Sequence, residues 1–144
     1  MTPTADTATS RVLPVLDDPE TAGFWAAAAE HRLVVRACPG CGRERHLPRA
    51  FCSACGTVGE SWVDVPPAGR LVSWTVVEHQ VHPGYPTPYT VLLVELEGRP
   101  GVRMMGQLPG RPSTELSAGQ PMEAWFEHVG DTVLPQWRPV GGAW

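Results

Sequence analysis

Alternating apolar and polar positions mark the second half of the chain and predict five β-strands. The expected strands cover residues 70–79, 89–97, 102–108, 121–129 and 133–139. A turn at Glu97–Gly101 makes the second and third strands a hairpin. Five short strands that each turn one apolar face inward predict a small closed barrel of the OB type. Residues 109–120 are too short and broken for the helix often found between the third and fourth strands, so we expect a modified barrel.

The inward face of this barrel is expected to include Val72, Trp74 and Val76 on the first strand and Leu92, Val94 and Leu96 on the second. The opposite faces also carry large apolar residues, namely Leu71, Val77, Val91, Leu93, Met105 and Trp125. A barrel of this size cannot cover both sets with its own strands. Because uncovered apolar patches mark interfaces, we expect the protein to work within a hetero-oligomer.

The first half of the chain predicts a different organisation. Residues 1–16 lack periodicity and are expected to form a flexible tail. An Asp-Asp-Pro-Glu sequence predicts a helix start, which gives a short N-terminal helix over residues 17–32. Residues 33–37 and 61–65 are strand-like and flank a cysteine-containing segment. We therefore expect a zinc ribbon over residues 33–65 and, after the break at Pro66–Gly69, an OB-fold domain over residues 66–144.

Four cysteines, Cys38, Cys41, Cys52 and Cys55, form the pattern C-x2-C-x10-C-x2-C. Two residues between paired thiols allow both sulfurs to face one point, and a glycine after each second cysteine permits the tight turn. Two such knuckles complete a tetrahedral set of four thiolates with no open position. The spacing predicts one structural zinc ion per chain, whose binding would fold this segment.

Three other uses of these cysteines are conceivable. Disulfides do not suit the intracellular setting expected below, and a redox C-x2-C motif usually stands alone. A rubredoxin-like iron site would use the same four sulfurs, and the sequence does not distinguish iron from zinc.

Charge and composition narrow the function classes. The formal net charge is −4, but residues 31–59 hold five arginines and one acid, so this segment is +4 and the rest is −8. The arginines either compensate the anionic metal site or form a small anion- or partner-binding patch. The chain contains no lysine, which excludes a lysine Schiff base. Without a long apolar run or a secretory signal, we expect a cytoplasmic protein that does not bind membranes.

The segment 80–88, between the first two barrel strands, carries the other candidate chemistry. His79, His82, Tyr85 and Tyr89 cluster around it, and three prolines stiffen it. A partner-facing or ligand-facing role is expected for this loop, although an ordinary surface loop explains it too. No nucleophile, base and acid come together there, so no catalytic residue is assigned. Trp62, Trp74, Trp125 and Trp137 are expected in the core or at an interface.

From Phe24 to Pro139 the chain resembles a family of acyl-CoA-associated proteins. The resemblance is carried by Phe24-Trp25, the paired cysteines, Leu47-Pro48-Arg49, the segment Gly69–Val77, Pro88-Tyr89, Gly119–Met122 and Leu134–Trp137. It implies an N-terminal helical segment, a rubredoxin-like zinc ribbon and a C-terminal OB-fold.

The resemblance also implies a function. Members accompany thiolase-fold enzymes, among them lipid-transfer-type aldolases and acyltransferases, or hotdog-fold hydratases, and help to form the acyl-CoA site. We expect a non-catalytic accessory subunit whose partner enzyme is a separate chain. The alternative is a nucleic-acid-binding module, since zinc ribbons and OB-folds both serve in that role. The acidic barrel and the absence of lysine argue against nucleic acid.

Overall fold

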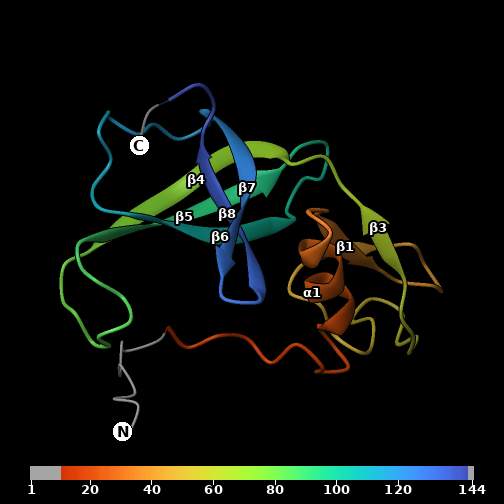
Figure 1. The fold of residues 1–144 in the computed structure, drawn as a ribbon. Coiled ribbons are helices and arrows are strands. Elements are labelled where there is room, and N and C mark those ends of the chain that lie inside the picture. The colour runs from red at the N-terminus through yellow and green to blue at the C-terminus, as the bar shows by residue number, and fades with distance from the viewer. Residues whose placement is uncertain (1–10, 143–144) are drawn as a thin grey trace, which may run out of the picture.

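The computed structural model describes residues 11–142 and contains two lobes. The ribbon lobe comprises α1 (Ala22–Ala29), β1 (Val34–Ala37), β2 (Glu44–Arg45) and β3 (Trp62–Asp64). The OB lobe comprises β4 (Ala68–Val77), β5 (Tyr89–Leu96), β6 (Arg103–Pro109), β7 (Pro121–Val129) and β8 (Thr132–Pro139). Residues 11–21 run along one side of both lobes (Figure 1). The mainly β fold, with one short helix, a zinc ribbon and an OB-fold domain, confirms the expected fold class.

The ribbon lobe is an antiparallel sheet in the order β2-β1-β3, with α1 beside it. The helix is shorter than the expected 17–32. The Asp18 carboxylate accepts a hydrogen bond from the Glu20 N–H at 2.8 Å, and the Asp18 carbonyl accepts from Thr21 and Ala22. Residues 17–21 form turns, and α1 begins at Ala22 with Thr21 as a cap residue that makes no side-chain cap hydrogen bond.

The OB lobe is an antiparallel sheet in the order β6-β5-β4-β7-β8. Its outer strands, β6 and β8, approach each other without a backbone ladder. Instead, Gln136 Oε1 accepts the Gln107 N–H at 2.7 Å, and Gln136 Nε2 donates to Glu127 at 2.8 Å. Gly106 permits this approach, because a Cβ there would lie 2.8 Å from the Trp137 nitrogen. The sheet therefore closes into a barrel, with no helix in residues 110–120.

The expected alternation is correct for β5, where Leu92, Val94 and Leu96 are buried. It is wrong for Leu71, which was expected on the outer face but is 1% exposed. A bulge between Leu71 and Ser73 shifts the register, so that Leu71 pairs with Val94 and Trp74 with Leu92 on the same face. Trp74 is nevertheless 38% exposed, because β7 pairs with β4 only at residues 68–70.

A single apolar core joins the lobes. Phe24, Val34 and Val35 of the ribbon lobe belong to the same buried cluster as Leu92 and Trp137 of the barrel. Trp62 and Trp125 are partly buried against this core. No helix among residues 11–142 has the length and apolar character needed to cross a membrane.

Candidate metal centre and interlobe groove

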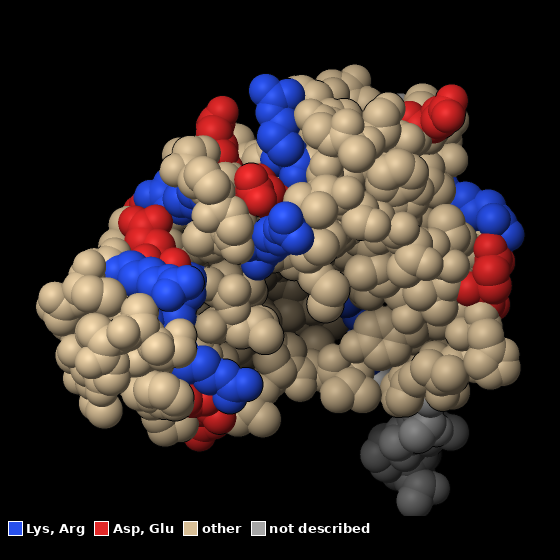
Figure 2. Space-filling model, turned by 180° about the vertical axis from the view of Figure 1, so that it is seen from behind, with Lys and Arg blue, Asp and Glu red and all other residues tan. Residues whose placement is uncertain are grey.

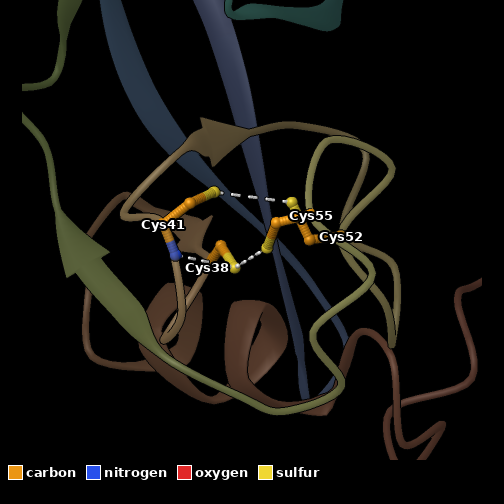
Figure 3. Close-up of side chains that lie close together, drawn as sticks. All are labelled: Cys38, Cys41, Cys52 and Cys55. Carbon is orange, nitrogen blue, oxygen red and sulfur yellow. Dashed lines mark hydrogen bonds between the residues drawn. The ribbon is translucent and has the colours of Figure 1, made fainter.

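The four cysteine sulfurs lie at the tips of two facing loops, where every pair is within 4.8 Å (Figure 3). Cys38 Sγ is 3.5 Å from Cys55 Sγ, and Cys41 Sγ is 3.7 Å from Cys52 Sγ. Sulfurs that bind zinc tetrahedrally at about 2.3 Å stand about 3.8 Å apart, so the set fits such an ion. Among the described residues, this is the only group of three or more Cys, His, Asp or Glu side chains close enough to hold a metal.

The two C-x2-C knuckles have the same local geometry. Cys38 and Cys52 begin each turn and are buried, whereas Cys41 and Cys55 end it and are exposed. The carbonyls of Cys38 and Cys52 accept the N–H groups of Gly42 and Gly56, both of which have a positive φ. Each glycine therefore supplies the left-handed residue with which the turn closes after its second cysteine.

Backbone N–H groups prepare the buried sulfurs for the thiolate form. Hydrogen bonds from Cys41 and Gly40 lower the pKa of Cys38 to about 6. Those from Cys55 and Ala54 lower the pKa of Cys52. The Arg43 N–H also lowers the pKa of Cys41, but burial and the three neighbouring sulfurs outweigh it and raise that pKa to about 11. A bound Zn²⁺ would stabilise thiolates at all four positions.

The arginines of the ribbon lobe mainly form hydrogen bonds and ion pairs that connect separate segments of the chain. Arg36 is 3% exposed and donates to the carbonyls of Glu20 and Gly59 at 3.1 and 2.6 Å, with its guanidinium over the Trp62 ring. Arg45 donates to two carbonyls of the cysteine loop, while Arg32 and Arg49 pair with acids. Arg36 is thus a buried cation next to the cysteine segment. Its two hydrogen bonds go to backbone carbonyls and not to a carboxylate.

The loop between β4 and β5 folds against the start of the described chain. Tyr85 donates to the Val12 carbonyl at 2.9 Å, and its ring lies between Arg11 and Tyr89. Arg11 also pairs with Glu127 at 2.5 Å. His82 Nδ1 accepts the Gly84 N–H, so the His82 side chain makes a hydrogen bond within its own loop. A cavity of about 260 Å³ lies beside Tyr85 and Tyr89, whereas His79 is exposed and does not line it.

Sequence reasoning missed a groove of about 470 Å³ between the lobes. Figure 2 shows this hollow from behind, with mostly uncharged residues around it. Phe24 and Trp25 of α1 form one wall, and Leu93, Leu134 and Trp137 of the barrel form another. Alternation along the chain predicts that Leu93 is an apolar residue on the outer face of its strand, but residues far apart in sequence form the groove, so no local pattern could reveal it.

The chain matches two family models and several known proteins. Residues 25–58 match the ChsH2 rubredoxin-like zinc ribbon domain, and residues 62–127 match the ChsH2 C-terminal OB-fold domain. A solved chain of the "Ltp2-ChsH2(DUF35) aldolase" is 30% identical with a TM-score of 0.77, over 88% of this chain and 98% of that one. A DUF35 protein of unknown function from Sulfolobus solfataricus is 16% identical over 78% of this chain and 80% of that one, with a TM-score of 0.55, which shows the fold alone.

Two curated relatives are longer proteins. A "Probable enoyl-CoA hydratase alpha subunit" of Thermomonospora curvata is 35% identical over 81% of this chain. The "3-oxo-4,17-pregnadiene-20-carboxyl-CoA hydratase alpha subunit" of Mycobacterium tuberculosis is 31% identical over 83% of it. The chain spans 37% and 38% of the length of these two relatives. With both domain models matched in order, and with the solved ChsH2 chain covered almost completely, this chain belongs to the ChsH2 (DUF35) family of zinc-ribbon and OB-fold proteins.

Proposed function

We propose that this chain is a non-catalytic accessory subunit that binds a thiolase-fold acyl-CoA enzyme, such as a lipid-transfer-type aldolase or acyltransferase, and helps to form its acyl-CoA site. The observation that carries the proposal is the match to nearly the whole ChsH2 chain of a solved aldolase. The names of the two curated relatives favour CoA thioesters as the substrate class of the assembly and leave a hydratase as another partner.

The exposed apolar surface supports an interface. One short segment carries four apolar side chains that are 37–67% exposed, namely Val12, Leu13, Val15 and Leu16. Val15 shares a shallow depression with Leu47, which is 69% exposed and also borders the interlobe groove. Exposed apolar side chains that gather in this way are unfavourable in water and are typical of a surface that a protein partner covers. We define residues 12–16 together with Leu47 as the apolar strip.

The metal centre has a structural role in this proposal. Cys38, Cys41, Cys52 and Cys55 would bind one Zn²⁺ per chain and leave no open position for substrate. Zinc would hold the cysteine loops, and the loop at residues 46–48 that lies between them would then be fixed beside the groove.

Co-expression with a candidate thiolase-fold enzyme tests the proposal. We expect a stable complex in size-exclusion chromatography with light scattering, and acyl-CoA turnover by the complex but not by this chain alone. Leu13→Glu combined with Leu16→Glu should weaken the complex at least tenfold, because two charges would be buried in the interface. Val140→Glu, at a 55% exposed site outside the strip, is the matched control and should leave binding unchanged. Turnover by the isolated chain would show that the accessory role is wrong.

A further inference from the structure

Two arginines of the ribbon lobe face each other across neighbouring strands. Arg36 of β1 and Arg45 of β2 are direct partners in the antiparallel ladder, so their side chains lie on the same face of the sheet. Arg36 is 3% exposed, and the Nε and Nη1 atoms of Arg45 are buried. Like charges placed directly opposite each other are destabilising, and burial strengthens their repulsion. A negative charge that offsets this pair is therefore expected nearby.

No carboxylate of the described chain supplies that charge. Among residues 11–142, neither Arg36 nor Arg45 forms an ion pair. The carboxylates of Glu20 and Glu44 pair with other arginines, and that of Glu60 accepts an indole N–H. Arg36 Nε, Arg45 Nε and Arg45 Nη1 are also buried without a hydrogen-bond partner. Buried donors left unpaired are rare in folded proteins and call for a physical reason.

The loop of residues 50–59, which carries the second C-x2-C knuckle, holds both side chains. Arg45 Nη2 donates to the Phe51 carbonyl at 3.1 Å, and Arg36 Nη2 donates to the Gly59 carbonyl at 2.6 Å. The Phe51 carbonyl belongs to the peptide bond with the first cysteine of this knuckle, and Arg36 lies two residues before the first cysteine of the other knuckle. The carbonyls orient the two cations at the base of the metal-binding loops but do not neutralise them.

The four cysteines supply a charge of the required sign and size. Their sulfurs lie within 4.8 Å of one another and fit one Zn²⁺. Four thiolates around one divalent ion carry two negative charges in excess, which equals the combined charge of the arginine pair. Attraction between groups buried in the same lobe is screened by salt much less than attraction between exposed groups.

We propose that Arg36 and Arg45 are the internal countercharge of the metal centre, so that their positive charge, in addition to their hydrogen bonds, stabilises the four-thiolate site. The inference goes beyond the proposed function, because it holds whichever partner the chain binds. It also decides between the two roles that composition leaves open for the arginines of residues 31–59. The two buried arginines compensate the metal centre, whereas Arg43 and Arg49 are exposed.

The zinc affinity of the full chain, measured by competition with a chelating indicator, tests the proposal. Arg36→Gln and Arg45→Gln should each lower this affinity about tenfold or more, as is typical when a group that supports a metal site is lost. Arg43→Gln is the matched control. Arg43 is as close in sequence to a cysteine but is exposed, so screening should limit its effect to less than about twofold.

Lysine substitutions separate the charge from the hydrogen bonds. Arg36→Lys and Arg45→Lys keep a positive charge but lose the planar fork of donors that guanidinium provides. If the site requires the charge, each lysine variant should bind zinc more tightly than the glutamine variant at the same position. Equal losses in the lysine and glutamine variants would show that the arginines only connect loops, and would overturn the proposal.

The reduction potential of the iron-substituted protein gives a readout that a purely structural role does not change. Iron held by four thiolates carries one more negative charge when ferrous than when ferric, so a nearby cation favours the ferrous form. Arg45→Gln should therefore shift the potential to more negative values, and Arg43→Gln should leave it nearly unchanged. Arg45 is less buried than Arg36, so this comparison remains available if Arg36→Gln does not fold. An unchanged potential in an Arg45→Gln variant with a normal iron absorption spectrum would contradict the proposal.

A small bound anion is the competing explanation for the unpaired N–H groups. Thermal melting of the full chain after metal removal, with and without inorganic phosphate, distinguishes the two. We expect phosphate to have the same small effect on the wild-type protein and on Arg45→Gln. Stabilisation by phosphate that disappears in Arg45→Gln, together with an unchanged zinc affinity of that variant, would make the pair an anion site and overturn the proposal.

Discussion

His31 and His128 face each other across the boundary between the two lobes, with their Nε2 atoms 2.9 Å apart. His31 ends α1 in a left-handed conformation, with a φ of +57°. Its N–H donates to Ala28, the following N–H donates to Ala27, and its ring stacks on Phe126 at 5.2 Å. A non-glycine residue in this conformation is strained. The contacts of the His31 ring with β7 offset the free-energy cost of that strain.

Substitutions at His31 should separate the backbone strain from the ring contacts. His31→Ala and His31→Gly both remove the stack and the hydrogen bond, but only glycine adopts this φ without strain. We expect His31→Ala to lower the free energy of unfolding by about 1 kcal/mol more than His31→Gly does. Urea denaturation measures the difference, with His79→Ala at an exposed position as the control. Equal stability of the two variants would contradict the strain argument.

The metal centre should control folding of the ribbon lobe. We expect elemental analysis to find about one zinc per chain in protein purified without added metal. Cys52→Ser should remove zinc and make the protein poorly soluble, because apparent binding energies of such sites reach ~10–16 kcal/mol. Ser53→Ala, in the same turn but exposed, should retain zinc and solubility. A metal-free wild-type protein with unchanged thermal melting would disprove the structural role.

Gln136 should be essential for barrel closure. It is 5% exposed, accepts the N–H of Gln107 on β6, which shares no ladder with β8, and donates to Glu127 on the neighbouring strand β7. Gln136→Leu keeps the approximate volume but leaves the buried Gln107 N–H without its acceptor and Glu127 with Arg11 as its remaining partner, so the free energy of unfolding should fall by about 1–3 kcal/mol. Gln80→Leu, on the exposed loop, should change it by less than about 0.5 kcal/mol. Chemical denaturation of both variants checks this, and equal effects would mean that Gln136 is not specifically required.

His46 should make stability depend on pH. Burial lowers its pKa from 6.5 to about 4 in the folded protein. The unfolded chain therefore binds more protons between these values, and the free energy of unfolding falls as pH falls from 6.5 toward 4. The shift corresponds to a loss on the order of 3 kcal/mol at most.

His46→Phe should reduce this loss, because phenylalanine does not titrate and still packs beside Phe24. Denaturation curves at several pH values measure the effect. Zinc content must be followed in the same samples, because acid also protonates the thiolates and releases metal. An identical pH dependence in the two proteins, at equal zinc content, would rule out His46 as its source.

Nucleic acid should bind weakly or not at all. Phosphate contacts dominate such binding and require clustered cations, whereas Arg32, Arg36, Arg45 and Arg49 already contact carbonyls or acids within the chain. Electrophoretic shift assays with single-stranded DNA and RNA at physiological salt should show no tight complex. Submicromolar binding that weakens steeply with salt would favour the nucleic-acid alternative over the accessory role.

The sequence by itself determined the features that depend on short stretches of chain. The C-x2-C pairs and their following glycines define each knuckle within five residues, and alternation locates the strands because side chains alternate across a sheet. The resemblance to acyl-CoA-associated proteins placed both domains in the correct order. The expected helix start was wrong: α1 begins only at Ala22, because an aspartate followed by a proline suits a turn as well as a helix start.

The tertiary structure decided every feature that joins distant residues. The bulge after Leu71 depends on how β4 meets β5, and it moves a side chain that simple alternation assigns to the outer face. The His31–His128 contact, barrel closure through Gln136, and the groove between Phe24 and Leu134 each require two lobes packed around one core. Spacing along the chain determines local geometry, but complementary packing of side chains determines which distant surfaces meet.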